Sequence, residues 1–128
     1  AKVLKEGKDL TIFATGIMVS EAMDAAKSLA DDGVDAEVID IHTIKPLDEK
    51  AIIESAKKTG LVVTAEEHSV IGGLGGAVAE LLSRELPTKM AMVGQQYTFG
   101  ESGKPDELKE KYGMTAKHIV EAVKKICK

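Results

Sequence analysis

Residues 61–82 read LVVTAEEHSVIGGLGGAVAELL, and this stretch decides the fold. Its first five residues are apolar without alternation, which is typical of a strand covered on both faces. After a glycine-rich segment, apolar residues recur at the spacing of one helix face. The members of that face are Leu74, Ala77, Val78, Leu81 and Leu82. The stretch therefore predicts a buried strand over residues 61–65, followed by an amphipathic helix.

The same unit of strand and helix recurs on both sides of this stretch. Apolar runs predict further strands over residues 10–14, 36–41 and 90–93, and residues 2–5 could add an edge strand. Long helical segments between strands imply right-handed crossovers and a mainly parallel sheet. We therefore expect one α/β domain over residues 1–128, with helices on both faces of the sheet.

Capping residues mark the ends of the predicted helices. Gly33 and Gly60 are typical of C-terminal caps, and Asp48 stands at the N-cap position of the second helix. Residues 105–113 predict a short helix that begins with proline, and Thr115 is expected to cap the last helix. Each long helix predicted between these caps is able to cover part of a sheet.

Composition argues against several classes of function. A net charge of −4, two Phe, two Tyr and no Trp argue against a nucleic-acid-binding protein. No apolar run approaches the roughly 20 residues that a membrane span needs. The single cysteine, Cys127, lies on the apolar stripe of the last helix, so we expect a buried, unreactive thiol and a cytoplasmic protein. Because the chain begins Ala1-Lys2-Val3, it is either a piece of a longer protein or a chain that has lost its initiator methionine.

The glycine-rich segment Gly72-Gly73-Leu74-Gly75-Gly76 does not match a dinucleotide-binding loop. Val78 stands where the last small residue of such a loop belongs, and glutamines replace the acidic residue expected about twenty positions later. Two interpretations remain open. The glycines allow close packing against the sheet or another chain, or the N–H groups at the helix start bind an anion.

Glu66, Glu67 and His68 directly follow the predicted strand, at the edge where ligands bind in open parallel sheets. In extended backbone Glu66 and His68 share one side, and Glu67 faces the other. Glu66 and His68 could form an acid–base or ion pair, but an isolated histidine at a strand end is more often a structural hydrogen-bonding group, and we favour that role. They do not suffice for a metal site, because His42 and His118 lie on other elements.

A hydroxyl, a flexible glycine and a cation come together at Ser102-Gly103-Lys104-Pro105, where a helix is predicted to begin. Such a group could hold a phosphate, but a helix cap followed by proline explains the same residues. Residue types and spacing alone therefore give no catalytic constellation.

Five separated motifs, in this order, resemble the C-terminal domain of the transketolase family. They are residues 12–16 (IFATG), 44–48 (IKPLD), 63–68 (VTAEEH), 72–75 (GGLG) and 102–108 (SGKPDEL). The last motif, together with Tyr112-Gly113 and the helix around Ile119-Val120, resembles transketolase in particular. The resemblance implies a three-layer α/β/α fold with a five-stranded, mostly parallel sheet and one antiparallel edge strand at residues 2–5.

The resemblance also implies a function for the whole enzyme and a lesser one for this domain. Transketolases move a two-carbon ketol unit between sugar phosphates. Their thiamine diphosphate and magnesium bind to an N-terminal and a pyrimidine-binding domain, so this domain would bind neither cofactor and would be inactive alone. Its partners would be those two domains, within a homodimer of the whole enzyme.

Three alternatives stay open. Deoxyxylulose phosphate synthases share the domain but tend to carry Glu-Glu-Asn in place of Glu66-Glu67-His68. The β subunits of 2-oxo acid dehydrogenase complexes share it too, and use it to dock an acyltransferase core. The third alternative is an autonomous regulatory module that binds anions.

A domain taken from a larger enzyme should expose the apolar surface that its partners cover. We expect Val70 and Ile71 to be unusually exposed, with Ile17 and Met18 as further candidates. The candidate interface or anion loop then comprises Glu66, Glu67, His68, Val70, Ile71, Gly72, Gly73, Gly75, Gly76, Ser102 and Lys104.

Overall fold

The computed structural model describes residues 1–42, 44, 46–69, 73–95 and 115–127. Its strands are β1 Lys2–Lys5, β2 Leu10–Ala14, β3 Ala36–Asp40, β4 Leu61–Ser69 and β5 Lys89–Gln95. They form one sheet in the order β1-β3-β2-β4-β5. Among these strands, β1 runs antiparallel to its neighbour and the other pairs are parallel. The predicted mostly parallel sheet with an antiparallel edge strand is confirmed.

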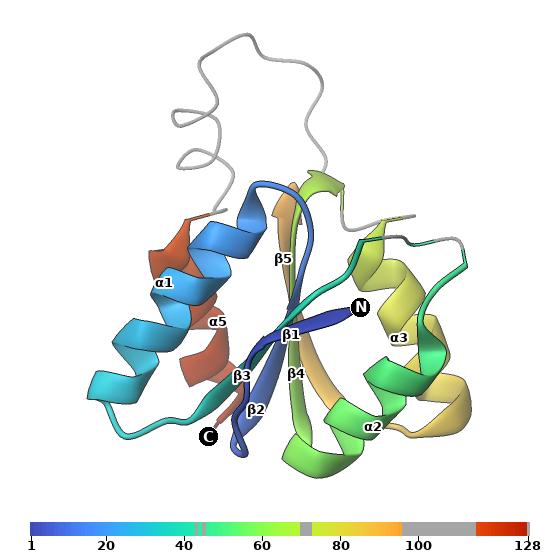
Figure 1. Ribbon diagram of the computed structural model, residues 1–128, viewed down its shortest axis with the longest axis horizontal. Coiled ribbons are helices and arrows are strands. Elements are labelled where there is room, and N and C mark those ends of the chain that lie inside the picture. The colour runs from blue at the N-terminus through green and yellow to red at the C-terminus, as the bar shows by residue number, and fades with distance from the viewer. Residues whose placement is uncertain (43, 45, 70–72, 96–114, 128) are drawn as a thin grey trace, which may run out of the picture.

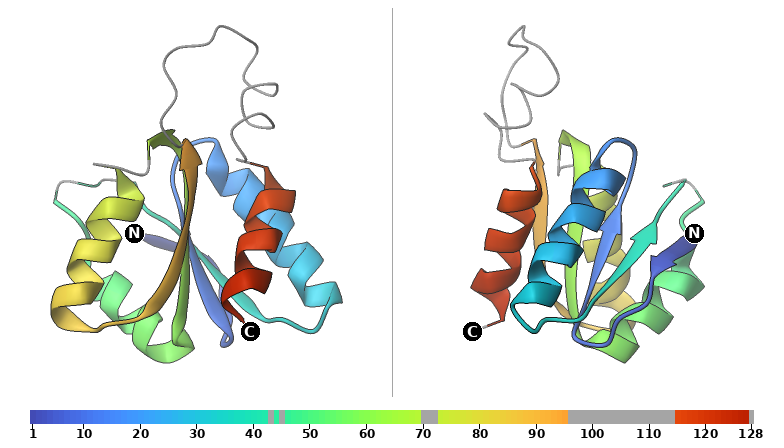
Figure 2. Two further views of the ribbon diagram at one scale, coloured as in Figure 1. Left: turned by 180° about the vertical axis from the view of Figure 1, so that it is seen from behind. Right: turned by 60° about the vertical axis from the view of Figure 1, so that its left-hand side comes forward.

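Helices cover both faces of this sheet. Those described are α1 Met18–Asp31, α2 Glu49–Thr59, α3 Leu74–Glu85 and α5 Ala116–Ile126. Helices α1 and α5 lie on one face, and α2 and α3 lie on the other (Figure 1). The turned views show the same three layers (Figure 2). Within the described residues, no helix is long and apolar enough to cross a membrane.

The alternation of side chains along β2 divides the core between the two faces. Ile12 and Ala14 pack in the cluster under α1 and α5, whereas Phe13 packs under α2 and α3. All three are fully buried. Because burial of a large apolar side chain contributes about 1.5–3 kcal/mol, this central strand anchors both helical layers.

The predicted caps of α1 and α2 are confirmed. Gly33 and Gly60 adopt φ angles of 82° and 77°, which a residue with a Cβ rarely adopts. Asp48 accepts a hydrogen bond of 3.3 Å from the Ala51 N–H, and this bond lowers the pKa of Asp48 below its usual value. Local sequence therefore fixes where these helices begin and end.

The last helix differs from its prediction in two details. Thr115 is the N-cap residue of α5, but its hydroxyl lies 2.7 Å from Nδ1 of His118 instead of accepting from a backbone N–H. Cys127 is exposed, so the prediction of a buried thiol is wrong. The cause is that α5 ends at Ile126, which leaves Cys127 beyond the stripe that packs on the sheet. The predicted helix over residues 105–113 lies outside the described residues.

Candidate functional site

The carboxyl ends of β2 and β4 form the edge where open parallel sheets bind ligands. Strands β2 and β4 are neighbours, yet β2 is followed by β3 on one side and β4 by β5 on the other. Strand β4 extends to Ser69, so Glu66, Glu67 and His68 lie within it. The prediction that they follow the strand is wrong, because β4 pairs with β5 again at Ser69, after an irregularity that begins at Ala65.

Glu66 is a buried carboxylate that caps α3. Its side chain is 1% exposed. Oε1 accepts the Leu74 N–H at 2.8 Å, and Oε2 accepts the Gly75 N–H at 2.6 Å. A negative charge at this position is also favoured by the helix dipole. The Glu66 carboxylate is thus the anion at the start of α3. The N–H groups of Leu74 and Gly75 are already bonded to it, so they are not free to bind an external anion.

Gly75 brings α3 close to the sheet. A Cβ at this position would lie 2.9 Å from Met92 Sδ and 3.0 Å from Thr64 Oγ1. These contacts support the packing interpretation for Gly75. Gly73 is the N-cap residue of α3 in extended backbone, and Gly76 is half-buried in its first turn.

Glu67 extends to the opposite side of the sheet from Glu66, beside the loop between β2 and α1. A Cβ on Gly16 would lie 2.6 Å from Glu67 Oε1, and Gly16 has a φ of 58°. The Thr15 N–H donates to the Ala65 carbonyl oxygen at 3.2 Å, which holds this loop against β4. The crevice between the ends of β2 and β4 therefore contains a side chain of the domain itself.

The predicted interface is only partly visible. Ile17 is 43% exposed, which agrees with its prediction. Met18 is fully buried, so its inclusion is wrong: it is the first residue of α1 and packs in the core. Val70, Ile71, Gly72, Ser102 and Lys104 lie outside the described residues, as does the side chain of His68. Their predicted roles, and any pairing of Glu66 with His68, remain predictions.

A second carboxylate cap at this edge was missed by sequence reasoning. Glu21 of α1 accepts the Ala116 N–H at 2.9 Å and so caps α5, although 95 positions separate the two residues. No local spacing could have shown this contact. Together, Glu21 and Glu66 show that two helix starts at this edge are satisfied by glutamates from other elements.

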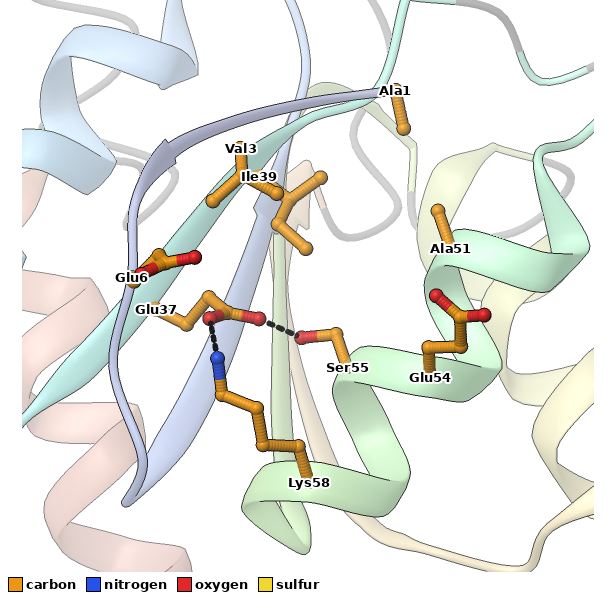
Figure 3. A pocket seen from close by; sticks show the side chains of 9 residues that line it. All are labelled: Ala1, Val3, Glu6, Glu37, Ile39, Ala51, Glu54, Ser55 and Lys58. Atoms are coloured by element: carbon orange, nitrogen blue, oxygen red, sulfur yellow. Dashed lines mark hydrogen bonds and ion pairs between the residues drawn. The ribbon is translucent and has the colours of Figure 1, made fainter.

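Sequence reasoning also missed a buried polar network at the corner formed by β1, β3 and α2. Glu37 Oε2 accepts the Ser55 hydroxyl at 2.6 Å, and Oε1 accepts Lys58 Nζ at 2.5 Å (Figure 3). Oε1 also accepts the Gly7 N–H at 3.2 Å. Burial raises the pKa of Glu37, but these hydrogen bonds outweigh burial and hold the pKa below its ordinary value. The sequence signal was a charged residue inside the apolar run at residues 36–41.

An open pocket of about 190 Å³ adjoins this network. Val3 and Ile39 form its apolar wall, and Glu6, Glu54 and Lys58 contribute charged groups (Figure 3). The Lys58 ammonium is already paired with Glu37, and this bond raises the pKa of Lys58. The Ser55 hydroxyl and the Lys58 ammonium both bond to Glu37, so the arrangement ties the edge strand to α2.

A family model for the C-terminal domain of transketolase matches residues 1–119. Among curated relatives, the 6-deoxy-6-sulfo-D-fructose transketolase subunit SqwH of Clostridium sp. (strain MSTE9) is 56% identical over 126 residues, which cover 98% of this chain and 39% of the subunit. The 1-deoxy-D-xylulose-5-phosphate synthase of Desulforudis audaxviator (strain MP104C) is 43% identical over 122 residues, which cover 94% of this chain and 19% of the synthase.

A solved structure of a split-gene transketolase, an inactive β4 tetramer, has the same fold. It matches with a TM-score of 0.93 and 56% sequence identity, over 98% of this chain and 41% of the solved chain. The chain therefore spans about two fifths of the curated subunit and of the solved chain that it matches.

Proposed function

The chain belongs to the transketolase C-terminal domain family, and from this premise we propose that it is the accessory domain of a thiamine-diphosphate-dependent transketolase. The whole enzyme transfers ketol units between sugars, and this domain supplies contacts to the catalytic domains. The observation that carries the proposal is the position of Glu66, because both of its carboxylate oxygens bond to the start of α3. Glu66, the acidic residue that the sequence placed where a ligand would bind, therefore has a structural role as the cap of α3.

The described residues do not form a site for the magnesium ion that accompanies thiamine diphosphate. In that part of the chain, no group of three or more His, Cys, Asp or Glu side chains could hold a metal ion. Glu67 faces away from Glu66, so the two carboxylates do not converge on one ion. We propose that both cofactors bind to the companion N-terminal and pyrimidine-binding domains.

The identity of the sugar is a separate part of the proposal. The relative at 56% identity is a subunit of a transketolase for 6-deoxy-6-sulfo-D-fructose. We propose that the assembled enzyme takes a ketose donor of this kind or a ketose phosphate, and that the companion domains select it. Both donors carry a terminal anion, so one basic pocket elsewhere in the enzyme could accept either.

The experiment combines this chain with a companion polypeptide that contains the two cofactor-binding domains. With thiamine diphosphate and magnesium, we expect turnover of xylulose 5-phosphate plus ribose 5-phosphate, or of the sulfo sugar, only when both polypeptides are present. Turnover by the chain alone, or stoichiometric retention of thiamine diphosphate by the chain alone, would overturn the proposal.

A second candidate is the C-terminal domain of a deoxyxylulose phosphate synthase. The relative of that kind is 43% identical to this chain, so the domain architecture fits. The same assembly experiment separates the two functions. Condensation of pyruvate with glyceraldehyde 3-phosphate, without ketol transfer between sugars, would establish the synthase instead.

We propose that the whole enzyme is a cytoplasmic homodimer, in the sense that it contains two copies of each of its polypeptides. The single cysteine of this chain supports a reducing compartment. Light scattering of the assembled enzyme measures the copy number, and cell fractionation measures the location. A secreted protein, or one copy of each polypeptide per particle, would contradict this part.

A further inference from the structure

Glu67 differs from Glu66 in having no partner within the described chain. Its carboxylate accepts no hydrogen bond and forms no ion pair with any residue that the structure describes. The side chain is nevertheless half-buried, against the Gly16 turn. A half-buried carboxylate is stabilised by a cation that binds to it.

The surroundings of Glu67 are built to hold the carboxylate in place. Any side chain at position 16 would collide with Glu67 Oε1, since a Cβ would lie 2.6 Å away, and the φ of 58° at Gly16 also favours glycine. The turn is held to β4 by the Thr15 N–H, which donates to the Ala65 carbonyl oxygen. This hydrogen bond fixes the Gly16 turn against β4, beside the carboxylate.

Exposed apolar surface directly follows the Gly16 turn, which packs against this carboxylate. Ile17, the residue after Gly16, is one of three large apolar side chains that the described residues expose. A side chain with an apolar stem and a positive end, which is Arg or Lys, matches both features.

We propose that Glu67 and Ile17 form a contact for the companion catalytic domain, in which a guanidinium or ammonium group of that domain binds the Glu67 carboxylate. This inference rests on the proposed function, since it names the partner of an accessory domain. The cation belongs to a protein surface, because Ile17 offers an apolar neighbour that an inorganic cation would leave exposed. The contact is distinct from the Glu66 cap, which faces the other layer of helices.

The test measures the binding of this chain to the companion polypeptide by isothermal titration calorimetry. Glu67→Gln keeps the size of the side chain beside Gly16 and removes its charge. We expect affinity to fall about 10- to 30-fold, as for removal of one partner of a partly buried charge pair. Glu67→Lys should weaken binding further, because it opposes two cations. Glu54→Gln, an exposed glutamate on α2, is the matched control and should stay within about twofold of the wild type.

Salt gives an independent readout of the same contact. Raising sodium chloride from about 0.05 to about 0.5 M should weaken the wild type more than Glu67→Gln, because screening acts on a charge that the variant lacks. Equal affinities and equal salt dependences would overturn the inference while leaving the proposed function intact. If the wild-type chain does not bind the companion at all, both the inference and the proposed function fail.

Discussion

Glu66 and Glu37 are both buried glutamates, but different groups stabilise their carboxylates. At the carboxyl edge of the sheet, Glu66 accepts two backbone N–H groups at the start of α3. At the corner of β1, β3 and α2, Glu37 accepts Ser55, Lys58 and one backbone N–H, from Gly7. The first region orders a helix start with backbone dipoles, and the second joins three elements with side chains.

This difference separates two tasks of the domain. The Glu66 arrangement contains no cation among the described partners and fixes the start of α3, and Glu67 of the proposed companion contact is the next residue of β4. The Glu37 network joins β3 to α2 and to Gly7, the residue that follows β1 and Glu6, and so holds the edge strand on the sheet. Variants of the first region should change both stability and assembly, whereas variants of the second should change stability alone.

The largest effect is expected for Glu66→Ala. The substitution leaves the N–H groups of Leu74 and Gly75 buried without acceptors and opens a cavity, so the free energy of unfolding should fall by about 3–5 kcal/mol. Urea titration followed by circular dichroism measures the loss. Glu80→Ala, an exposed glutamate on α3, is the control and should lose less than about 0.5 kcal/mol. A loss below about 1 kcal/mol for Glu66→Ala would contradict the capping role.

Gly7→Ala should cause the next largest loss in the free energy of unfolding. Together with Gly75→Ala, it tests how well each of the two regions accommodates an added methyl group. A Cβ on Gly7 would lie 2.4 Å from the Ala36 carbonyl carbon and 2.5 Å from the Glu37 backbone nitrogen. These backbone atoms cannot move without shifting β3, so we expect a loss of about 2–3 kcal/mol in urea unfolding. Gly75→Ala is the counterpart, and should lose less because Met92 and Thr64 meet it with side chains. Equal losses for the two variants would show that the backbone around Gly7 adjusts as easily as the side chains around Gly75.

Glu37→Gln tests the charge of the second region through pH. The folded pKa of Glu37 lies below its ordinary value of 4.5, so the carboxylate contributes stability above that pH and loses it as pH falls through the folded pKa. At pH 7 we expect the variant to lose about 1–2 kcal/mol, a modest value because Lys58 is 46% exposed. The gap between wild type and variant should close toward pH 3. Urea midpoints at both pH values measure it, and a gap independent of pH would rule out the ionic contribution.

The fold was predictable because its signals are local. The apolar runs at residues 10–14 and 61–65 lie in β2 and β4, and Asp48 and Gly60 cap the two ends of α2 as predicted. A strand or a cap depends on residues within a few positions, which a single sequence displays. Met18 was misplaced because α1 begins one residue before its apolar spacing becomes visible.

The site was less predictable because its contacts depend on tertiary structure. In the sequence, Glu66 has the position of a ligand-binding residue at a strand end. Only the tertiary structure shows that α3 packs close enough to bond to both of its carboxylate oxygens. The extension of β4 through four polar residues was hidden for the same reason, since a buried glutamate is tolerated only when its oxygens are hydrogen-bonded. The Glu21 contact with Ala116 spans 95 positions and leaves no trace in local spacing.

The smallest effect, and the one with opposite sign, is expected for Thr64→Val beside Gly75. Thr64 Oγ1 is fully buried and has no hydrogen-bond partner among the described residues. Valine has nearly the same shape without the hydroxyl, so the variant should gain up to about 1 kcal/mol in urea unfolding. Thr11→Val is the matched control in the second region, because Thr11 Oγ1 lies 2.7 Å from Ser55 Oγ and 2.8 Å from Thr59 Oγ1 and its loss should destabilise. Destabilisation by Thr64→Val would mean that this hydroxyl has a polar partner, and that the edge region, like the corner, depends on side-chain hydrogen bonds.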